Sequence, residues 1–200
     1  MKISLQNTGK RYNRDWIFRH LNYEFTSPGS YAITGLNGSG KSTLLQVIAG
    51  SVLHSEGDII YISNGKVVES PHPYFSMATP YLELVEEMTA LELINFHGRF
   101  KKISITPSEL LKNAGLETSA SKQIRYFSSG MKQRLKLALT FFSETPVILL
   151  DEPITNLDKD GIALYHSFIK YAEGRLIIVS SNDEQEYLFC KNIIRIADYK

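Results

Sequence analysis

Residues 35–43 read Gly-Leu-Asn-Gly-Ser-Gly-Lys-Ser-Thr, and this stretch decides the fold. Glycines let the backbone curl so that successive N–H groups all point at one anion. A lysine and a hydroxyl residue directly after the last glycine complete the spacing of a phosphate-binding loop. We therefore expect this loop to surround the phosphates of a nucleotide with all nine of its residues: Gly35, Leu36, Asn37, Gly38, Ser39, Gly40, Lys41, Ser42 and Thr43.

Two residues of this loop have specific tasks in such a site. Lys41 is expected to reach the β- and γ-phosphates, and the Ser42 hydroxyl is expected to bind Mg²⁺. Residues 31–34 predict a short strand before the loop, and residues 42–49 predict an apolar helix whose N-terminal dipole faces the phosphates. A strand and a helix in these places argue against a chance glycine-rich turn.

An acidic pair closes a second apolar segment. Residues 147–150 read Val-Ile-Leu-Leu, which predicts a parallel strand buried on both faces, and Asp151 and Glu152 follow directly. An enzyme with a phosphate-binding loop needs a carboxylate there to hold Mg²⁺, and Asp151 is the candidate. Glu152 is the candidate catalytic residue that polarises the water attacking the γ-phosphate. The alternative is a pair of solvated acids in a strand-to-helix loop.

The composition excludes several classes of protein. The chain has 200 residues, of which 43% are hydrophobic, and its net charge of +1 gives no long-range attraction to nucleic acid. We therefore expect one domain and no nucleic-acid partner.

Cys190 is the only cysteine, and its apolar neighbours suggest a packed residue in a reducing compartment. No secretory signal and no apolar run of ~18 residues is present, so we expect membrane contact only through a partner.

The remaining patterns predict an antiparallel layer followed by helices. Alternation over residues 3–7 and 17–25 predicts strands, and Asn64-Gly65 predicts a hairpin. Further helices are expected at residues 89–100, 107–114, 130–142 and 159–173, and further strands at residues 58–62, 66–68, 176–180 and 192–197. We predict one α/β domain over residues 1–200, with a mixed or parallel sheet core, an antiparallel β layer and a helical insertion at roughly residues 80–144.

The segment before the acidic strand carries a family resemblance. Phe127-Ser128-Ser129-Gly130-Met131 is by composition a capped helix start, whose free N–H groups can also bind an anion. It resembles the signature of the ATP-binding cassette (ABC) ATPases, usually Leu-Ser-Gly-Gly-Gln. Asp151-Glu152-Pro153 and Thr155-Asn156-Leu157-Asp158 resemble the Walker B and D-loop segments of these P-loop NTPases. Tyr12 stands where the family places an aromatic residue that stacks on adenine. The resemblance covers nearly the whole chain, and a nucleotide kinase would lack the signature helix.

The resemblance implies a mechanism that needs two cassettes. They would pair head to tail, so that each ATP lies between one phosphate loop and the partner's signature, contributed by Ser128, Ser129 and Gly130. Asp158 would belong to the D-loop. ATP would close the pair and hydrolysis would open it. The implied protein is the ATP-binding subunit of an ABC transporter, a homodimer or paired cassette that uses ATP and Mg²⁺. It would be cytoplasmic and peripheral on the inner face of the cell membrane, bound to a separate transmembrane permease subunit.

Two departures from the family pattern predict a slow ATPase. The family has a glutamine between the hairpin and the insertion, whereas no glutamine lies between Gln46 and Gln123 here. Thr79 and Glu83 are the candidate substitutes. The family also has a histidine after the strand at 176–180, where this chain has Asn182, whose amide can donate a hydrogen bond but cannot carry a proton. We expect Asn182 to contact the γ-phosphate, and we expect Glu152 to keep the site active.

Two further readings of the sequence stay open. The chain could be an ATP-gated dimerising switch with little hydrolysis, or a soluble ABC protein that acts outside transport. Residues 75–100 are the candidate contact surface for a transport partner, because they carry many apolar side chains beside the insertion. For most of these side chains, the sequence favours the alternative that they pack the insertion's own core.

Overall fold

The computed structural model describes residues 1–200. The chain forms two compact units, and most contacts of each unit lie within that unit. The sheet unit comprises Met1–Phe75, Pro146–Glu152 and Gly174–Lys200. The helical unit comprises Ser76–Thr145 and Pro153–Glu173. The helical unit thus contains the expected insertion at 80–144 and adds a helix from beyond the acidic strand.

An antiparallel sheet opens the chain. Its strands lie in the order β2-β1-β4-β5, with the bounds β1 Lys2–Tyr12, β2 Asp15–Thr26, β4 Glu56–Ser63 and β5 Lys66–Val67. Ile3 pairs with Phe25 on one side and with Tyr61 on the other, and all three side chains are buried. Asn64 and Gly65 both have positive φ, as a two-residue hairpin turn requires, so the predicted hairpin is confirmed.

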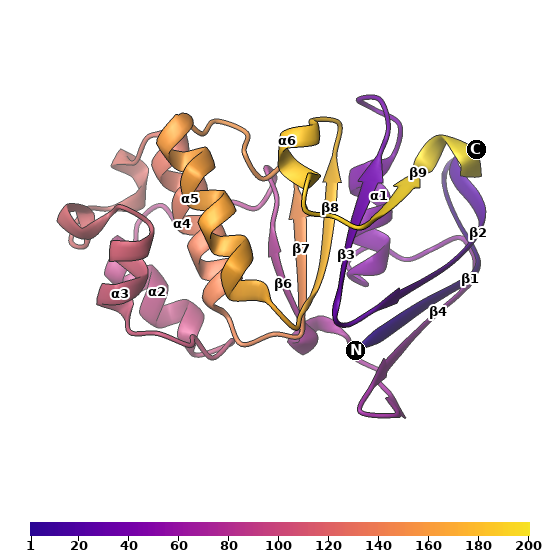
Figure 1. The fold of residues 1–200 in the computed structure, drawn as a ribbon, viewed down its shortest axis with the longest axis horizontal. Coiled ribbons are helices and arrows are strands. Elements are labelled where there is room, and N and C mark those ends of the chain that lie inside the picture. The colour runs from indigo at the N-terminus through magenta and orange to yellow at the C-terminus, as the bar shows by residue number, and fades with distance from the viewer. The chain divides into compact units, whose positions relative to one another are not determined.

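A parallel sheet forms the rest of the sheet unit. Four of its strands lie side by side in the order β7-β8-β3-β9 (Figure 1), with the bounds β3 Gly29–Thr34, β7 Val147–Asp151, β8 Leu176–Ser181 and β9 Asn192–Arg195. Every residue of β7 and β8 is buried, as expected for strands covered on both faces. Helix α1, Lys41–Ile48, packs on β7 and β8, and the short α6, Glu184–Tyr187, follows β8.

Four helices dominate the helical unit: α2 Ala90–Gly98, α3 Pro107–Asn113, α4 Ser129–Phe142 and α5 Lys159–Ile169. Helices α2 and α3 each begin with a capping box, formed by Thr89 with Glu92 and by Thr106 with Glu109. Aromatic side chains join α4 to α5, with the ring centroids of Phe142 and Phe168 5.3 Å apart. None of the helices has the length and apolar character needed to span a bilayer.

The predicted element ends differ from the structure in a few places. Helix α5 ends at Ile169 rather than near residue 173, because Lys170–Ala172 tightens into a 3-10 turn. Strand β9 ends at Arg195 rather than at 197, because Ile196–Tyr199 also forms a 3-10 turn. Strand β6, Phe75–Ala78, and helix α6 were not expected, since each has four residues and too little pattern to detect.

Candidate phosphate-binding site

The phosphate loop connects β3 to α1 within the sheet unit. Gly40, the residue before the first helical residue of α1, has φ of 104°, a left-handed conformation that favours glycine. A Cβ added to Gly40 would lie 2.2 Å from Ile17 Cγ2, so a side chain is excluded on steric grounds as well. A Cβ on Gly38, where φ is 74°, would meet nothing within 4 Å. The loop therefore leaves no space for a side chain at Gly40, next to the helix, whereas the space around Gly38 is open.

Lys41 is held inside the loop by backbone oxygens. Its side chain is buried, and Nζ donates to Gly35 O at 2.9 Å and to Leu36 O at 3.2 Å. The first turn of α1 has no acidic residue and no side-chain cap, so its N–H groups and the ammonium share one positive region. This region suits an anion with several oxygens, such as a polyphosphate.

The acidic strand ends in a carboxylate that is buried and incompletely satisfied. Asp151 is 2% exposed, and its Oδ1 has no hydrogen-bond partner. Ser180 Oγ, on the residue that pairs with Asp151 across β7 and β8, is also buried without a partner. Burying such oxygens is costly unless something binds them. Because parallel strands end at the same edge of a sheet, these oxygens lie at the edge where the phosphate loop begins.

A divalent cation fits this donor set. Mg²⁺ prefers oxygen ligands and is usually held by one or two carboxylates together with substrate phosphates. No group of three or more His, Cys, Asp or Glu side chains in the chain could hold a metal ion alone. Asp151 and the Ser42 hydroxyl stay the predicted ligands, and phosphate oxygens would complete the coordination.

Glu152 has a strained backbone. Its φ is 45°, and its N–H donates to Ser180 O at 2.9 Å. An L-residue in this left-handed region costs about 1–2 kcal/mol. The chain bends at Glu152, directly after the end of β7. Strain of this kind clusters at functional sites, which supports the assignment of Glu152.

Asn182 reaches the phosphate loop through a contact that the sequence did not reveal. It follows Ser181, which pairs with Thr34 at the end of β3, and its Nδ2 donates to Asn37 Oδ1 at 3.0 Å. The structure therefore brings Asn182 to the predicted site, with a loop side chain as its present partner. The amide nitrogen has a second N–H that this bond leaves available.

Tyr12 lies at the end of β1 and is 47% exposed. The Lys10 ammonium lies 4.7 Å from the centroid of its ring, and the same Nζ donates to Leu53 O at 2.8 Å. One face of the ring is thus occupied by a cation, so a stacked base must use the other face. Sequence reasoning missed Lys10, although its position two residues before Tyr12 on a strand was a detectable signal.

The signature residues begin a helix, as their composition predicts. Ser128 caps α4, and its Oγ accepts a hydrogen bond from Met131 N at 3.2 Å. A Cβ on Gly130 would lie 3.0 Å from Asn156 O, which places the D-loop backbone beside the signature. Asp158 caps α5 by accepting from Gly161 N at 2.8 Å. Ser128 and Ser129 are exposed, as residues that contact a second chain must be.

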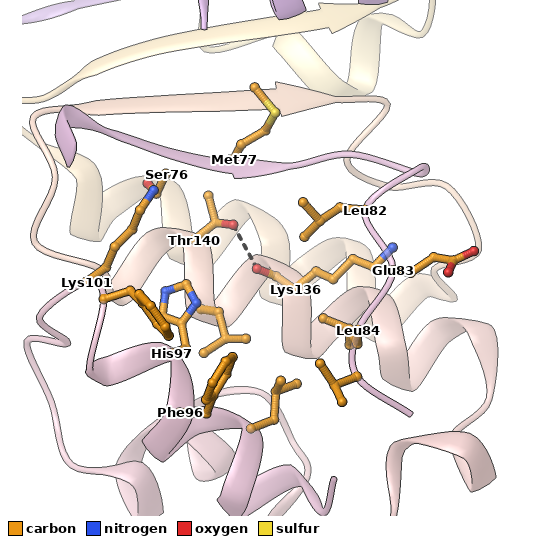
Figure 2. Close-up of a pocket in the computed structure, with 14 residues that line it drawn as sticks. Ser76, Met77, Leu82, Glu83, Leu84, Phe96, His97, Lys101, Lys136 and Thr140 are labelled. Atoms are coloured by element: carbon orange, nitrogen blue, oxygen red, sulfur yellow. Dashed lines mark hydrogen bonds between the residues drawn. The ribbon is translucent and has the colours of Figure 1, made fainter. Parts of the chain in front are cut away.

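The helical unit also contains a groove formed by β6, the loop after it, α2 and α4 (Figure 2). We call it the α2–α4 groove; its cavity has a volume of about 290 Å³. Thr79 is buried and its backbone oxygen accepts from Lys136 Nζ, whereas Glu83 is exposed and lines the groove. Neither side chain is singled out as the substitute for the missing glutamine.

The apolar residues of the 75–100 stretch differ in burial, and Met77, Leu84 and Met88 are half-buried. Phe75 and Leu93 are buried, as the core alternative expected. Tyr81 is 72% exposed, and Leu82 and Val85 are also exposed, so the core alternative is wrong for these three. They lie in a segment without helix or strand, where no neighbouring turn covers them.

Cys190 is half-buried, so it is not the fully packed core residue that the sequence suggested. Burial raises the pKa of its thiol to about 12, so the thiolate that a nucleophile requires is scarce near neutral pH.

Comparisons with known proteins agree with this geometry. A protein-family model described as "ABC transporter" matches residues 18–155. The lantibiotic transport ATP-binding protein SrtF of Streptococcus pyogenes is 30% identical over 200 residues, covering 93% of this chain and 83% of that protein. The cytochrome c biogenesis ATP-binding export protein CcmA of Haemophilus influenzae is 30% identical over 190 residues, covering 92% of this chain and 90% of that protein.

Solved structures show the same fold. The cassette MJ0796, in a dimeric post-hydrolysis state bound to ADP and Pi, matches with a TM-score of 0.84 at 23% identity, covering 97% of this chain and 94% of that chain. A putative ABC transporter ATP-binding protein from Pyrococcus furiosus matches with a TM-score of 0.84 at 20% identity over all of both chains. The predicted fold class is thereby confirmed.

Proposed function

The chain belongs to the ABC transporter family, and we propose that it is the ATP-binding and ATP-hydrolysing subunit of a transporter. One observation carries the proposal: the buried, unpartnered Oδ1 of Asp151 lies at the sheet edge where the loop holding Lys41 begins. A nucleotide triphosphate with Mg²⁺ would satisfy both groups. The names of SrtF and CcmA, which describe ATP-binding proteins of transport systems, support the same function.

Each residue at this sheet edge would have a separate role in ATP binding or hydrolysis. Lys41 and the loop N–H groups would balance the charge of the β- and γ-phosphates, and Tyr12 would stack on the adenine. Ser42 and Asp151 would hold Mg²⁺, which neutralises charge on the phosphate oxygens when bound. Glu152 would accept a proton from the attacking water, and Asn182 would donate its second N–H to a γ-phosphate oxygen.

We propose that two cassettes work head to tail. The exposed Ser128 and Ser129 and the Gly130 backbone would contact the γ-phosphate of the partner, and the γ-phosphate would hold the pair closed until hydrolysis. Ser128→Arg tests this arrangement, because a bulky cation would occupy the partner's γ-phosphate position. The variant should bind ATP as a monomer without pairing. If it pairs with ATP as well as the parent does, the head-to-tail arrangement is wrong.

The transport partner would be a separate membrane protein, and the cassette would lie at the inner face of the cell membrane. The exposed apolar residues of the 75–100 stretch support this, because isolated soluble chains rarely leave such groups uncovered together. Purification from detergent-solubilised membranes should recover a multi-span protein with this chain. Recovery of ribosomal subunits instead would contradict a role in transport.

The hydrolysis itself is tested with MgATP at high protein concentration and a phosphate-release assay. Glu152→Gln is the matched variant, because glutamine keeps the size of the side chain and removes the base. The parent should release phosphate about 10² to 10⁴ times faster than the variant, and the variant should accumulate as an ATP-bound pair.

A second function is favoured by one observation. Asn182 is bonded to Asn37, and no histidine lies at the phosphate loop, so the chain lacks the imidazole that the family places there. An ATP-gated switch that pairs on ATP and hydrolyses it negligibly would need no such group. Equal phosphate release by the parent and Glu152→Gln would establish this second function in place of the first.

A further inference from the structure

The Tyr12 ring is 47% exposed, yet a neighbouring side chain holds it. Tyr12 is the last residue of β1, and an exposed aromatic ring at this place would otherwise change rotamer freely. Lys10 lies two residues earlier and therefore on the same face of the strand, with its Nζ 4.7 Å from the ring centroid. A cation over the face of an aromatic ring attracts the ring electrostatically. The Lys10 ammonium therefore favours one orientation of the Tyr12 ring.

The Lys10 ammonium is itself bound to the turn that follows helix α1. Its Nζ donates to Leu53 O at 2.8 Å. One residue earlier, Val52 N donates at 3.2 Å to Gln46 O, which belongs to the last turn of α1. The Tyr12 ring is thus connected through Lys10 to the C-terminal end of α1, and the phosphate loop precedes the N-terminal end of the same helix.

Ser55 fixes the backbone on both sides of Lys10. Its N–H donates to Gly9 O at 2.7 Å, and its Oγ accepts a hydrogen bond from Arg11 N at 3.1 Å. The end of β1 therefore cannot shift along the segment that carries Leu53 O without breaking these two hydrogen bonds. Because the backbone and the ammonium are both tied to this segment, the fold sets the place of the Lys10 charge.

Lys10 also differs from the lysine at the other end of the same strand. Lys2 forms an ion pair with Glu24, whereas Lys10 Nζ donates to a backbone carbonyl and forms no ion pair. A carboxylate beside the ammonium would compete with the ring for its positive charge. The charge of Lys10 is therefore available to the Tyr12 ring, while that of Lys2 is used by a neighbouring acid.

We propose that Lys10 is a positioning residue for the nucleobase, because it holds the Tyr12 ring ready to accept a base on its other face. This inference rests on the proposed function, in which Tyr12 stacks on the adenine. Lys10 would touch neither the base nor the phosphates and would act only through the ring. Ordering the ring before the ligand arrives removes an entropic cost of binding, so it increases the affinity for the nucleoside part of ATP.

The test compares two ligands that differ by the nucleoside, MgATP and magnesium tripolyphosphate. Isothermal titration of the full chain measures the dissociation constant of each. We call the ratio of the tripolyphosphate constant to the ATP constant the nucleoside advantage, which separates the adenosine contribution from that of the phosphates. In the parent it should be about tenfold or more, since stacking a base on an aromatic side chain contributes about 1–3 kcal/mol.

Three variants test the role of the ammonium. Lys10→Met keeps an unbranched apolar stem and removes the charge, so it should reduce the nucleoside advantage about two- to fivefold and leave the affinity for tripolyphosphate unchanged. Lys10→Arg should restore most of the advantage, because a guanidinium also stacks on aromatic rings. Lys2→Met removes a lysine from the same strand and should change neither affinity.

Three results of these titrations overturn the proposal. The first is an unchanged nucleoside advantage in Lys10→Met. The second is an equal loss of affinity for both ligands in that variant, since this would indicate a merely structural lysine. The third is a Lys10→Arg protein that binds both ligands as Lys10→Met does.

A double variant shows whether Lys10 acts through the ring. Tyr12→Leu should remove most of the nucleoside advantage, and adding Lys10→Met should then cause no further loss. A further loss would mean that Lys10 acts on the nucleotide directly, which overturns its role as a positioning residue. If the parent binds neither ligand, the proposed function fails and this role fails with it. If the parent binds MgATP and Lys10→Met keeps the full advantage, only the role of Lys10 fails.

Discussion

The surroundings of one buried or half-buried lysine ammonium differ between the two units. Lys41 in the sheet unit is enclosed, and its ammonium is bonded to two loop carbonyls. Lys136 in the helical unit has one long bond to a carbonyl in a groove of exposed apolar side chains. The pocket that holds the first ammonium is built by Gly35 and Leu36, which are its neighbours in the sequence. The second is built by distant segments and leaves apolar surface exposed. A short sequence motif can therefore identify the ligand that it binds, whereas an exposed surface indicates only the charge and polarity of its partner.

The largest effect should follow removal of the enclosed lysine. Lys41→Ala should weaken MgATP binding about 100-fold or more, because two hydrogen bonds to charged oxygens contribute about 1.5–3 kcal/mol each. Isothermal titration measures the affinity. Lys66→Ala is the control, since Lys66 is an exposed lysine on β5 of the same unit. Comparable losses in the two variants would show that general charge, rather than the loop, binds ATP.

The next effect concerns Asn182, the residue that joins β8 to the phosphate loop. If its amide donates to the γ-phosphate, Asn182→Ala should lose about 1–3 kcal/mol and slow hydrolysis by one to two orders of magnitude. Asn182→His should match or exceed the parent rate. Turnover of the three proteins at saturating MgATP is the measurement. An alanine variant as fast as the parent would remove Asn182 from the chemistry.

A difference of about 1–3 kcal/mol in stability should distinguish two glycines of the phosphate loop. Gly40→Ala introduces both a left-handed alanine and a collision with Ile17 Cγ2, whereas Gly38→Ala introduces only the strained backbone. We expect Gly40→Ala to lower the free energy of unfolding by about 2–4 kcal/mol and Gly38→Ala by about 1 kcal/mol. Chemical denaturation of both variants measures the difference. Equal losses would show that the helix end of the loop is not the tighter part.

The smallest effect belongs to the groove and depends on pH. Burial lowers the pKa of His97 from its ordinary value of 6.5, so the unfolded chain binds this proton more readily than the folded chain. Stability should therefore fall as pH drops from 6.5 through the lower pKa of the folded state. Thermal unfolding from pH 7.5 to 5 should show this loss, and His97→Gln should reduce it. An unchanged slope in the variant would mean that other groups cause the pH dependence.

The sequence predicted best where structure depends on near neighbours. The helix after the phosphate loop, the Asn64-Gly65 hairpin and the helix expected from residue 89 follow from residues only a few positions apart, and each is found within about two residues of its expected start. The apolar run at 147–150 likewise implied a buried strand. That Asp151 and Lys41 lie at one edge of the sheet follows from the strand order β7-β8-β3, which no single segment of the sequence encodes.

Other features depend on contacts that no local pattern encodes. Asn37 and Asn182 are 145 positions apart, so their hydrogen bond could not be expected from either segment. The exposure of Tyr81 and Val85 was missed because an apolar residue is buried only if a neighbouring segment covers it. Strand β6 is too short for its alternation to be recognised.

The strained backbone at Glu152 has a consequence for how this chain can change over time. A glycine there would adopt φ of 45° freely and should raise the melting temperature by about 2 °C, since one kcal/mol shifts a chain of this size by about 2–4 °C. It would also delete the carboxylate. Substitutions that increase stability at this position would therefore remove the carboxylate that we propose as the base, so stability and the proposed chemistry oppose each other here.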